Sequence, residues 1–386
     1  MGPLQGVKIL EVGGIGPGPF CGMMLSDMGA DVIRIEKKGQ FKRISARHDI
    51  LTRNRRSVIV NLKSQAGIDV VLRMVEKVDA LQEGFRPLVM EHLGLGPDVC
   101  LKRNPKLVYG RMTGWGQDGP LSQAAGHDIN YIALSGALHG IGRPESKPVV
   151  PLNLIGDFGG GGMLLAFGMV CALFEARQSG KGQVVDAAIL DGAAALMAMT
   201  CSLRASGLWS DMRGQNLLDG GAHFYDTYET KDGKYISIGS IEPEFYARLR
   251  QLAQLDGPDF DAQMDQSKWP TLKKKMEIAF KSKTRDEWCT IMEGSDVCFA
   301  PVLSITEAAE HPHNRQRNIF NCADGLIQPS PAPRFSRTRP EIKSRPSLPG
   351  EHTEAVLKDF GFTPSEITLL KADGTIADSG KTPSQD

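Results

Sequence analysis

The sequence predicts an α/β protein in which a large domain built on a parallel sheet precedes a smaller α+β domain. Residues 7–37 contain a strand, a loop rich in glycine and proline, a helix and a second strand, which is the pattern of a parallel β-loop-α-β unit. After about residue 210 the pattern changes to a hairpin followed by several helices, which favours a second, smaller domain.

The first half of the chain supplies the elements of the large domain. The loop after the first strand begins like a dinucleotide fingerprint at Gly14 and Gly16, but Pro19 stands where the third glycine belongs, which argues against a nicotinamide cofactor. Apolar segments bounded by turn residues predict strands at 7–12, 31–37, 57–62, 107–112 and 184–190. Helices are expected at 21–30, 64–78, 89–94, 158–176 and 193–206.

The smaller domain is predicted from turn and capping signals. Alternating residues flank Asp232 and Gly233, a pair that favours a hairpin turn. Capping boxes at Thr284-x-x-Glu287 and Ser304-x-x-Glu307 predict the starts of two helices. The expected organisation is a large domain at 1–200, a linker at 201–224, the small domain at 225–320, a proline-rich linker at 321–349, and a C-terminal segment at 350–386 that returns to the large domain.

Composition narrows the class of protein. The 386 residues carry 45 basic and 45 acidic side chains, so bulk charge does not indicate a nucleic-acid partner. The seven cysteines contain no C-x-x-C pair, which predicts neither a zinc site nor a disulfide framework and favours a reducing, intracellular compartment. The apolar run 163–174 is too short to span a bilayer, so no membrane insertion is expected, and we recognise no targeting signal.

A basic run follows the second predicted strand. Open α/β sheets bind ligands at strand ends, and arginine fits phosphate bidentately, so this run predicts a polyphosphate site. The alternative is a solvated loop. The run contains a single acid, Asp49, and its basic residues are Lys37, Lys38, Lys42, Arg43, Arg47, Arg53, Arg55 and Arg56.

The segment 124–162 contains the two residues that most directly indicate a catalytic role. His127 and Asp157 could lie on opposite sides of one carbon, so that one removes a proton and the other returns it. A carbon beside a thioester carbonyl is acidic enough, and backbone N–H groups near Gly126 or after Asp157 could stabilise the enolate. The alternatives are a structural histidine and a helix-capping aspartate. However, a cap does not require the four glycines 159–162, which weaken a helix and indicate a close approach to the backbone.

Long segments of the chain resemble the α-methylacyl-CoA racemases of the family III CoA-transferase superfamily, from Leu4 to about Phe362. The matching segments are GPGPFCGMML, GHDINYIALSG, PLNLIGDFGGGG, GKGQVVDAAILDG, RGQNLLDGGAHFYDTYETKDGKY and IGSIEPEFY. The resemblance implies a Rossmann-like CoA-binding large domain, a small α+β domain and an interlocked homodimer. It also implies an acyl-CoA substrate, no metal, no redox cofactor, and a mitochondrial or peroxisomal location.

The resemblance also assigns roles to individual residues. His127 and Asp157 match the family's acid/base pair, and Glu242 matches a glutamate that partners the histidine, from the other subunit. Leu88 stands where many relatives have glycine, and Lys37 where they often have arginine, so contacts with CoA could differ in detail. The expected CoA and substrate contacts are Lys37, Val60, Asn61, Leu62, Lys63, Arg86, Gly126, Asp128, Ile129, Asn130 and Tyr131.

Two alternatives to a racemase are kept open. In a CoA transferase of the same fold, Asp157 would attack the thioester and form an acyl-aspartyl anhydride. A non-catalytic acyl-CoA binder would bind CoA tightly without exchanging any proton.

Overall fold

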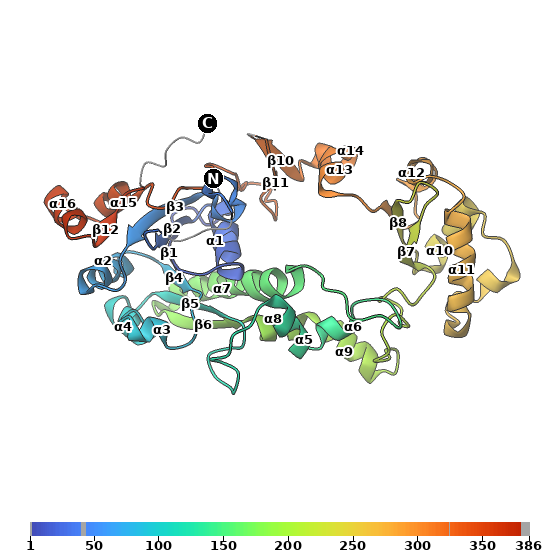
Figure 1. Cartoon of the computed structure of the whole chain (residues 1–386), viewed down its shortest axis with the longest axis horizontal. Helices are drawn as coiled ribbons and strands as arrows, with labels where there is room; N and C mark the ends of the chain where they lie inside the picture. Colours follow the sequence, from blue (N-terminus) through green and yellow to red (C-terminus); the bar gives the residue numbers. More distant parts are fainter. Residues whose placement is uncertain (1, 40–43, 324, 380–386) are drawn as a thin grey trace. The chain divides into compact units, whose positions relative to one another are not determined.

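The computed structural model describes residues 2–39, 44–323 and 325–379 of the chain. The contacts divide it into two units, each described by itself below. The large unit consists of Met1–Ser135, Leu152–Leu196 and Asn318–Asp386, and therefore contains both the blue and the red ends of the chain in Figure 1. The small unit consists of Gly136–Pro151 and Met197–Arg317.

The large unit is built on a seven-stranded sheet with the order β12-β3-β2-β1-β4-β5-β6. Six of the strands run parallel, and β12 pairs antiparallel with β3 at the edge. The predicted parallel sheet is therefore confirmed. The strands are β1 (Lys8–Val12), β2 (Asp31–Glu36), β3 (Arg55–Val60), β4 (Ala80–Glu83), β5 (Val108–Thr113), β6 (Gln183–Ala188) and β12 (Ile376–Ala377).

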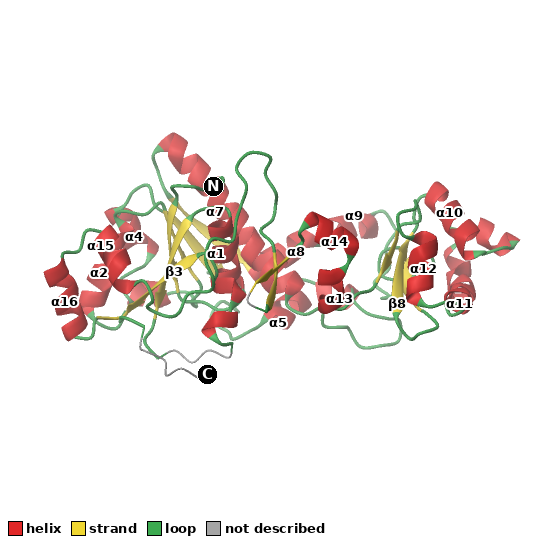
Figure 2. Ribbon diagram, turned by 90° about the horizontal axis from the view of Figure 1, so that it is seen from above, coloured by secondary structure: helices red, strands yellow, loops and turns green. Residues whose placement is uncertain are grey.

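Helices cover both faces of this sheet, because successive strand side chains point to opposite sides (Figure 2). Leu10 belongs to the hydrophobic core on one face and its neighbour Ile9 to the core on the other. The first core packs against α2 (Gln65–Val75), α3 (Val89–His92), α4 (Pro97–Arg103), α15 (Thr353–Asp359) and α16 (Pro364–Ala372). The second packs against α1 (Pro17–Asp27), α5 (Asp128–Leu134), α7 (Leu164–Ser179) and α8 (Ile189–Leu196).

A π-helical segment, η3 (Leu154–Met163), leads directly into α7. The N–H of Phe158 donates to the carbonyl of Asn153, five residues earlier, at 3.3 Å, which is the wide turn of a π-helix. Together they form the one helical stretch of the described residues, Leu154–Ser179, that is long and apolar enough for a membrane span. One face of α7 packs on the sheet as part of its core, whereas Phe167 and Phe174 of the same helix are 68% and 65% exposed.

Shorter elements complete the large unit. Two short 3₁₀ turns, η1 (Ala46–His48) and η2 (Ile50–Thr52), precede β3. The antiparallel pair β10 (Phe320–Ala323) and β11 (Leu326–Pro329) begins its last segment.

The small unit contains an antiparallel sheet of β7 (Tyr225–Glu229), β8 (Tyr235–Gly239) and β9 (Phe299–Pro301). The hairpin at Asp232 and Gly233 is confirmed, as are the capping boxes of Thr284 and Ser304. The core is aromatic, with Phe224, Trp269, Phe280 and Trp288 buried together. Its helices are α6 (Ala137–Gly140), α9 (Ala198–Ala205), α10 (Pro243–Ala253), α11 (Trp269–Phe280), α12 (Arg285–Met292), α13 (Ile305–Glu310) and α14 (Pro312–Arg317), with 3₁₀ turns η4 (Pro258–Asp261) and η5 (Gln266–Lys268).

Candidate active site

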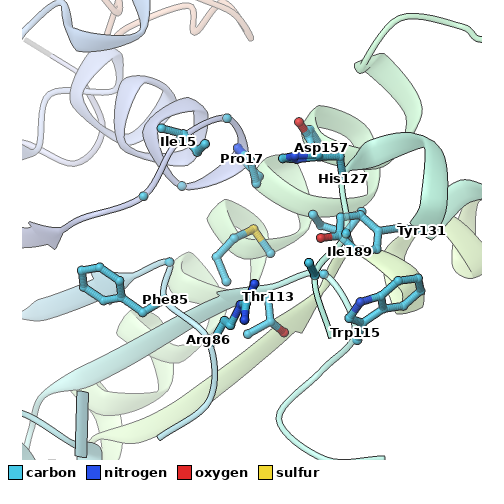
Figure 3. A pocket seen from close by; sticks show the side chains of 18 of the residues that line it. Ile15, Pro17, Phe85, Arg86, Thr113, Trp115, His127, Tyr131, Asp157 and Ile189 are labelled. Atoms are coloured by element: carbon cyan, nitrogen blue, oxygen red, sulfur yellow. The ribbon is translucent and has the colours of Figure 1, made fainter. Parts of the chain in front are cut away.

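A pocket of about 690 Å³ opens in the large unit at the carboxyl ends of its parallel strands (Figure 3). The strand order reverses between β1 and β4, and the loops that follow both strands line the pocket. The loop after β5, with Gly114 and Trp115, forms a further part of the wall. The pocket therefore lies where open α/β sheets bind their ligands.

The loop after β1 uses glycine to bring other parts of the wall close. Gly13 has a positive φ of 64°, and a β-carbon there would collide with the ring of Phe85 from the loop after β4. Gly16 also has a positive φ, 70°, and a β-carbon there would lie 3.0 Å from Oδ2 of Asp157. This loop therefore shapes the pocket around an acidic side chain.

His127 stands at the N-cap of α5 and lines the pocket with an exposed side chain. Its backbone N–H donates to Oδ1 of Asn130 at 3.0 Å, while its carbonyl accepts the N–H of Asn130 at 2.8 Å. These two bonds fix the backbone at the start of the helix. They leave the imidazole directed at the pocket and beside Asp157, as seen in Figure 3.

Asp157 lies within η3, not at a helix N-cap, so the capping alternative for this residue is wrong. Its backbone N–H donates to Oδ2 of Asp128 at 2.6 Å, which ties η3 to the first residue of α5. Its own Oδ2 accepts a long hydrogen bond of 3.5 Å from the Asn153 amide. Asp128 is thus a buried brace between the segments that carry His127 and Asp157.

Burial raises the pKa of the Asp157 carboxyl above its usual value. The negative charge of Asp128 raises this pKa further, whereas the Asn153 hydrogen bond and the nearby His127 act in the opposite direction. A carboxyl whose proton is held more tightly than usual, beside an imidazole in one pocket, is suited to exchanging a proton with a bound ligand.

The glycine run 159–162 makes room for protein, not for a ligand. A β-carbon on Gly160 would lie 2.6 Å from the backbone nitrogen of Ala193 in α8. One on Gly162 would lie 2.6 Å from the carbonyl oxygen of Pro17 at the start of α1. The predicted close approach is confirmed, and it serves to pack η3 between two helices.

Aromatic and cationic side chains complete the pocket. The ring of Trp115 packs edge-on against that of Tyr131, with centroids 4.7 Å apart, and a β-carbon on Gly114 would strike Tyr131. Burial raises the pKa of Tyr131, Asp157 raises it further, and Arg86 opposes them. The carboxyl of Asp157 and the exposed guanidinium of Arg86 therefore both act on the phenol of Tyr131 within this pocket.

The structure distributes the other predicted contact residues unequally. Arg86, Gly126, Asn130 and Tyr131 line the pocket, whereas Asp128 and Ile129 are not among its lining residues. Other predicted residues lie outside this pocket, although they are at the carboxyl edge of the same sheet. They are Lys37, which follows β2, Val60, the last residue of β3, and Asn61, Leu62 and Lys63, which follow it.

The side chain of Val60 is only 1% exposed and packs in the core, so it could offer a ligand backbone contacts alone. Glu242 belongs to the small unit, where it is the N-cap residue of α10.

The phosphate prediction is wrong for three arginines of the basic run. Arg53 is buried against Asp27 at 2.6 Å, Arg55 is buried against Glu11, and Arg56 binds Asp31 at 2.5 Å and Asp359 at 2.6 Å. These acids come from α1, β1, β2 and α15, so only the fold brings them to the basic run.

Lys37, Lys38 and Arg47 of the same run are exposed. Lys42 and Arg43 lie outside the described residues.

The sequence assigned no role to Ile15, Phe85, Thr113 and Ile189, although all four line the pocket. The rule that ligands bind at strand ends would have indicated Phe85, had the short strand β4 been recognised. Within the described ranges, no three His, Cys, Asp or Glu side chains gather in a way that could hold a metal ion.

This chain belongs to CoA-transferase family III, whose model matches residues 4–353. The predicted superfamily is therefore confirmed.

Among its relatives, the alpha-methylacyl-CoA racemase of Mus musculus is 47% identical over 374 residues, covering 96% of each chain. That of Homo sapiens is 43% identical over 378 residues, covering 97% of each. A CAIB/BAIF family protein from Brucella suis shares the fold, with a TM-score of 0.80 at 24% identity, covering 93% of this chain and 99% of that one.

Proposed function

We propose that this protein is a racemase that interconverts the (2R) and (2S) forms of 2-methylacyl-CoA thioesters. The observation that carries the proposal is that His127 and Asp157 line one pocket, where burial raises the pKa of the carboxyl. Relatives at 43–47% identity over nearly the whole chain bear the name alpha-methylacyl-CoA racemase, which supports the same reaction.

In the proposed mechanism, the thioester binds with C2 between the imidazole of His127 and the carboxyl of Asp157. One group takes the C2 proton and leaves an enolate, and the other group gives its proton to the opposite face of C2. The two groups exchange roles for the opposite substrate enantiomer. Each acid or base step of this kind contributes about 10²–10⁴ in rate.

The developing enolate oxygen needs hydrogen-bond donors. The N–H groups of Asp128 and Ile129, the first two of α5, are proposed for this role, because the first N–H groups of a helix have no intrahelical partner. The N–H groups of Asp157 and Phe158 are less suitable, since they already donate to Asp128 at 2.6 Å and to the carbonyl of Asn153 at 3.3 Å. Of the two donor regions expected from the sequence, near Gly126 and after Asp157, we therefore propose the first, at the start of α5.

The CoA portion is proposed to follow the carboxyl edge of the sheet. Arg86, which is exposed in the pocket, would meet a phosphate, and Lys37 would meet another at the end of β2. The segment 60–63, which begins at the last residue of β3, lies at the same edge and would run along the nucleotide. Substrate contacts near the acyl group are assigned to Gly126, Asn130 and Tyr131, with Asp128 and Ile129 behind or beside them.

The assembly is proposed to be an interlocked homodimer, in which Glu242 of the partner subunit contacts His127. A carboxylate there would orient the imidazole and stabilise its charged form. The proposed metabolic setting is the breakdown of branched-chain fatty acids or bile-acid intermediates, in mitochondria or peroxisomes.

The test is proton exchange at C2. In deuterated water, 2-methylacyl-CoA incubated with the enzyme should gain deuterium at C2 while its two epimers equilibrate. The competing transferase reaction would transfer the acyl group to Asp157 and release CoA as its thiolate. Hydroxylamine added to the enzyme with acyl-CoA would trap that anhydride, so trapping without C2 exchange would favour the transferase. CoA binding with neither result would leave the non-catalytic binder.

A further inference from the structure

The segment Gly84–Leu88 joins β4 to α3 and forms one wall of the pocket, where it presents Phe85 and Arg86 (Figure 3). Its last residue, Leu88, has φ 70° and ψ −7°, which lie in the left-handed region. Glycine adopts this conformation freely, but residues with a β-carbon rarely do so. The surrounding contacts must therefore hold this wall segment in place.

One guanidinium binds carboxylates on both sides of the wall segment. Nε of Arg111 on β5 donates to Oε1 of Glu83, the residue just before the segment, at 3.1 Å. Its Nη1 and Nη2 donate to the two carboxylate oxygens of Glu91, in the helix just after the segment, at 2.7 and 3.2 Å. A two-pronged arginine–carboxylate bond constrains direction as well as distance, so Arg111 fixes both ends of the segment together.

Glu83 also holds the wall segment directly. Its Oε2 accepts the N–H of Phe85 at 2.8 Å, and its side chain is fully buried. Burial raises the pKa of this carboxyl to about 7, against the opposing influence of the Phe85 N–H and of Arg111. The phenyl ring of Phe85 covers Gly13, where a β-carbon would collide with it, so the segment is also joined to the loop after β1.

We propose that Arg111 is a positioning residue for acyl-CoA binding: by holding Glu83 and Glu91, it sets where Arg86 and Phe85 stand in the pocket. Arg111 is itself 7% exposed and does not line the pocket, so it acts through the segment. The inference rests on the proposed function, because a CoA ligand supplies the phosphate that Arg86 would meet.

The contacts of Arg111 with Glu83 and Glu91 are called the clamp below, and two variants test it. Glu91→Gln weakens one half of it at a partly exposed side chain and leaves the Glu83–Arg111 pair intact. Arg111→Met combined with Glu83→Gln removes both charges of the buried pair, which avoids leaving one of them unpaired. The KM for 2-methylacyl-CoA should rise about threefold in the first and about tenfold in the second, with kcat near that of the parent. The matched control is Arg103→Met, which breaks the exposed Arg103–Glu76 pair of 2.9 Å in the same unit.

Hydrogen exchange at residues 84–88 measures the clamp without any ligand. Both variants should exchange the Phe85 amide faster than the parent, whereas Arg103→Met should not. Unchanged exchange in the double variant would show that Arg111 does not hold the segment. Faster exchange with an unchanged KM, or a drop in kcat alone, would rule out the positioning role.

If the parent itself neither binds CoA nor exchanges C2 hydrogen, the proposed function fails, and the role of Arg111 in ligand binding fails with it. If the Phe85 amide then still exchanges more slowly in the parent than in the variants, Arg111 holds the segment 84–88 but has no role in ligand binding. If only the proposal for Arg111 is wrong, C2 exchange is normal in the parent and KM is unchanged in both variants.

Discussion

Asp157 and Glu83 are two carboxyl groups of the large unit whose pKa values are both raised by burial. Glu83 is bound by Arg111 at 3.1 Å and by the N–H of Phe85 at 2.8 Å, and it is fully enclosed. Asp157 instead has a long bond of 3.5 Å from Asn153 and faces the pocket. Burial perturbs both groups, but the strength of their partners and their access to the pocket decide which can exchange a proton with a ligand.

The largest expected effect is on the rate of racemisation, at the carboxyl group that faces the pocket. His127→Ala and Asp157→Asn should each lower the rate of racemisation of 2-methylacyl-CoA by about 10²–10⁴, because each removes one of the two proton carriers. CoA binding, measured by calorimetry, should stay near that of the parent. Glu76→Gln, which changes an exposed acid of the same unit, is the control. Racemisation at the parent rate in both site variants would refute the assignment of the acid/base pair.

The next effect concerns a buried group in the small unit, His223. It is fully buried, its Nε2 lies 2.7 Å from the hydroxyl of Tyr246, and burial together with Lys273 lowers its pKa to about 4. Below pH 6.5 His223 therefore binds a proton in the unfolded chain, whereas in the folded unit it stays neutral down to about pH 4. The free energy of unfolding therefore falls by about 3 kcal/mol as the pH drops from 6.5 to 4.

Denaturant unfolding followed by tryptophan fluorescence checks this loss, because Trp209, Trp269 and Trp288 belong to the small unit. His223→Gln should flatten the pH dependence between 6.5 and 4. An equally steep loss in that variant would assign the effect to other groups.

A smaller effect tests the brace behind the acid/base pair. Asp128→Asn keeps an oxygen to accept the Asp157 N–H but removes the negative charge that helps to raise the pKa of Asp157. The acidic limb of the pH–rate profile should therefore move to lower pH, with little loss in the maximal rate. Asp128→Ala, which removes the acceptor as well, should also lower the rate. An unmoved limb in the asparagine variant would exclude the electrostatic role of Asp128.

The smallest effect concerns Leu88, beside the clamp. Leu88→Gly should raise the free energy of unfolding by about 0.5 kcal/mol, because relief of the left-handed conformation slightly exceeds the added freedom of the unfolded chain. Leu88→Ala keeps the strain and should give no gain. Thermal unfolding of both variants checks this difference, and an equal change in the two would show that the strain contributes nothing.

Much of the large unit could be predicted from local patterns. The strand and helix periods between residues 7 and 78 gave the parallel β-loop-α-β arrangement, and the turn and capping signals gave the hairpin and two helices of the small unit. The strand β4 was missed because it is only four residues long and ends in two polar residues, Gln82 and Glu83. Both are buried because the fold supplies partners, the carbonyl of Gly18 in α1 for Gln82 and Arg111 on β5 for Glu83. Because β4 was not predicted, Phe85, which follows it, was not expected to line the pocket.

The acid/base pair was a hypothesis from His127, Asp157 and the glycines that follow, and the structure brings the two residues into one pocket. Three arginines were misassigned because Glu11, Asp27 and Asp31 meet them only through strand pairing and helix packing. The wide turn at Asp157 has no local sequence signal, since it arises where η3 is packed between α8 and α1.

The close packing of Gly160 and Gly162 limits which positions near Asp157 can be altered. Adding even a methyl group at either position would push against backbone atoms 2.6 Å away, so the glycine segment 159–162 tolerates almost no variation without displacing the carboxyl of Asp157. Ile15, by contrast, lines the pocket from a loop and is 76% exposed, so a change there displaces no packed neighbour. Efforts to change the substrate choice of the proposed racemase should therefore vary Ile15 and leave the glycine segment 159–162 unchanged.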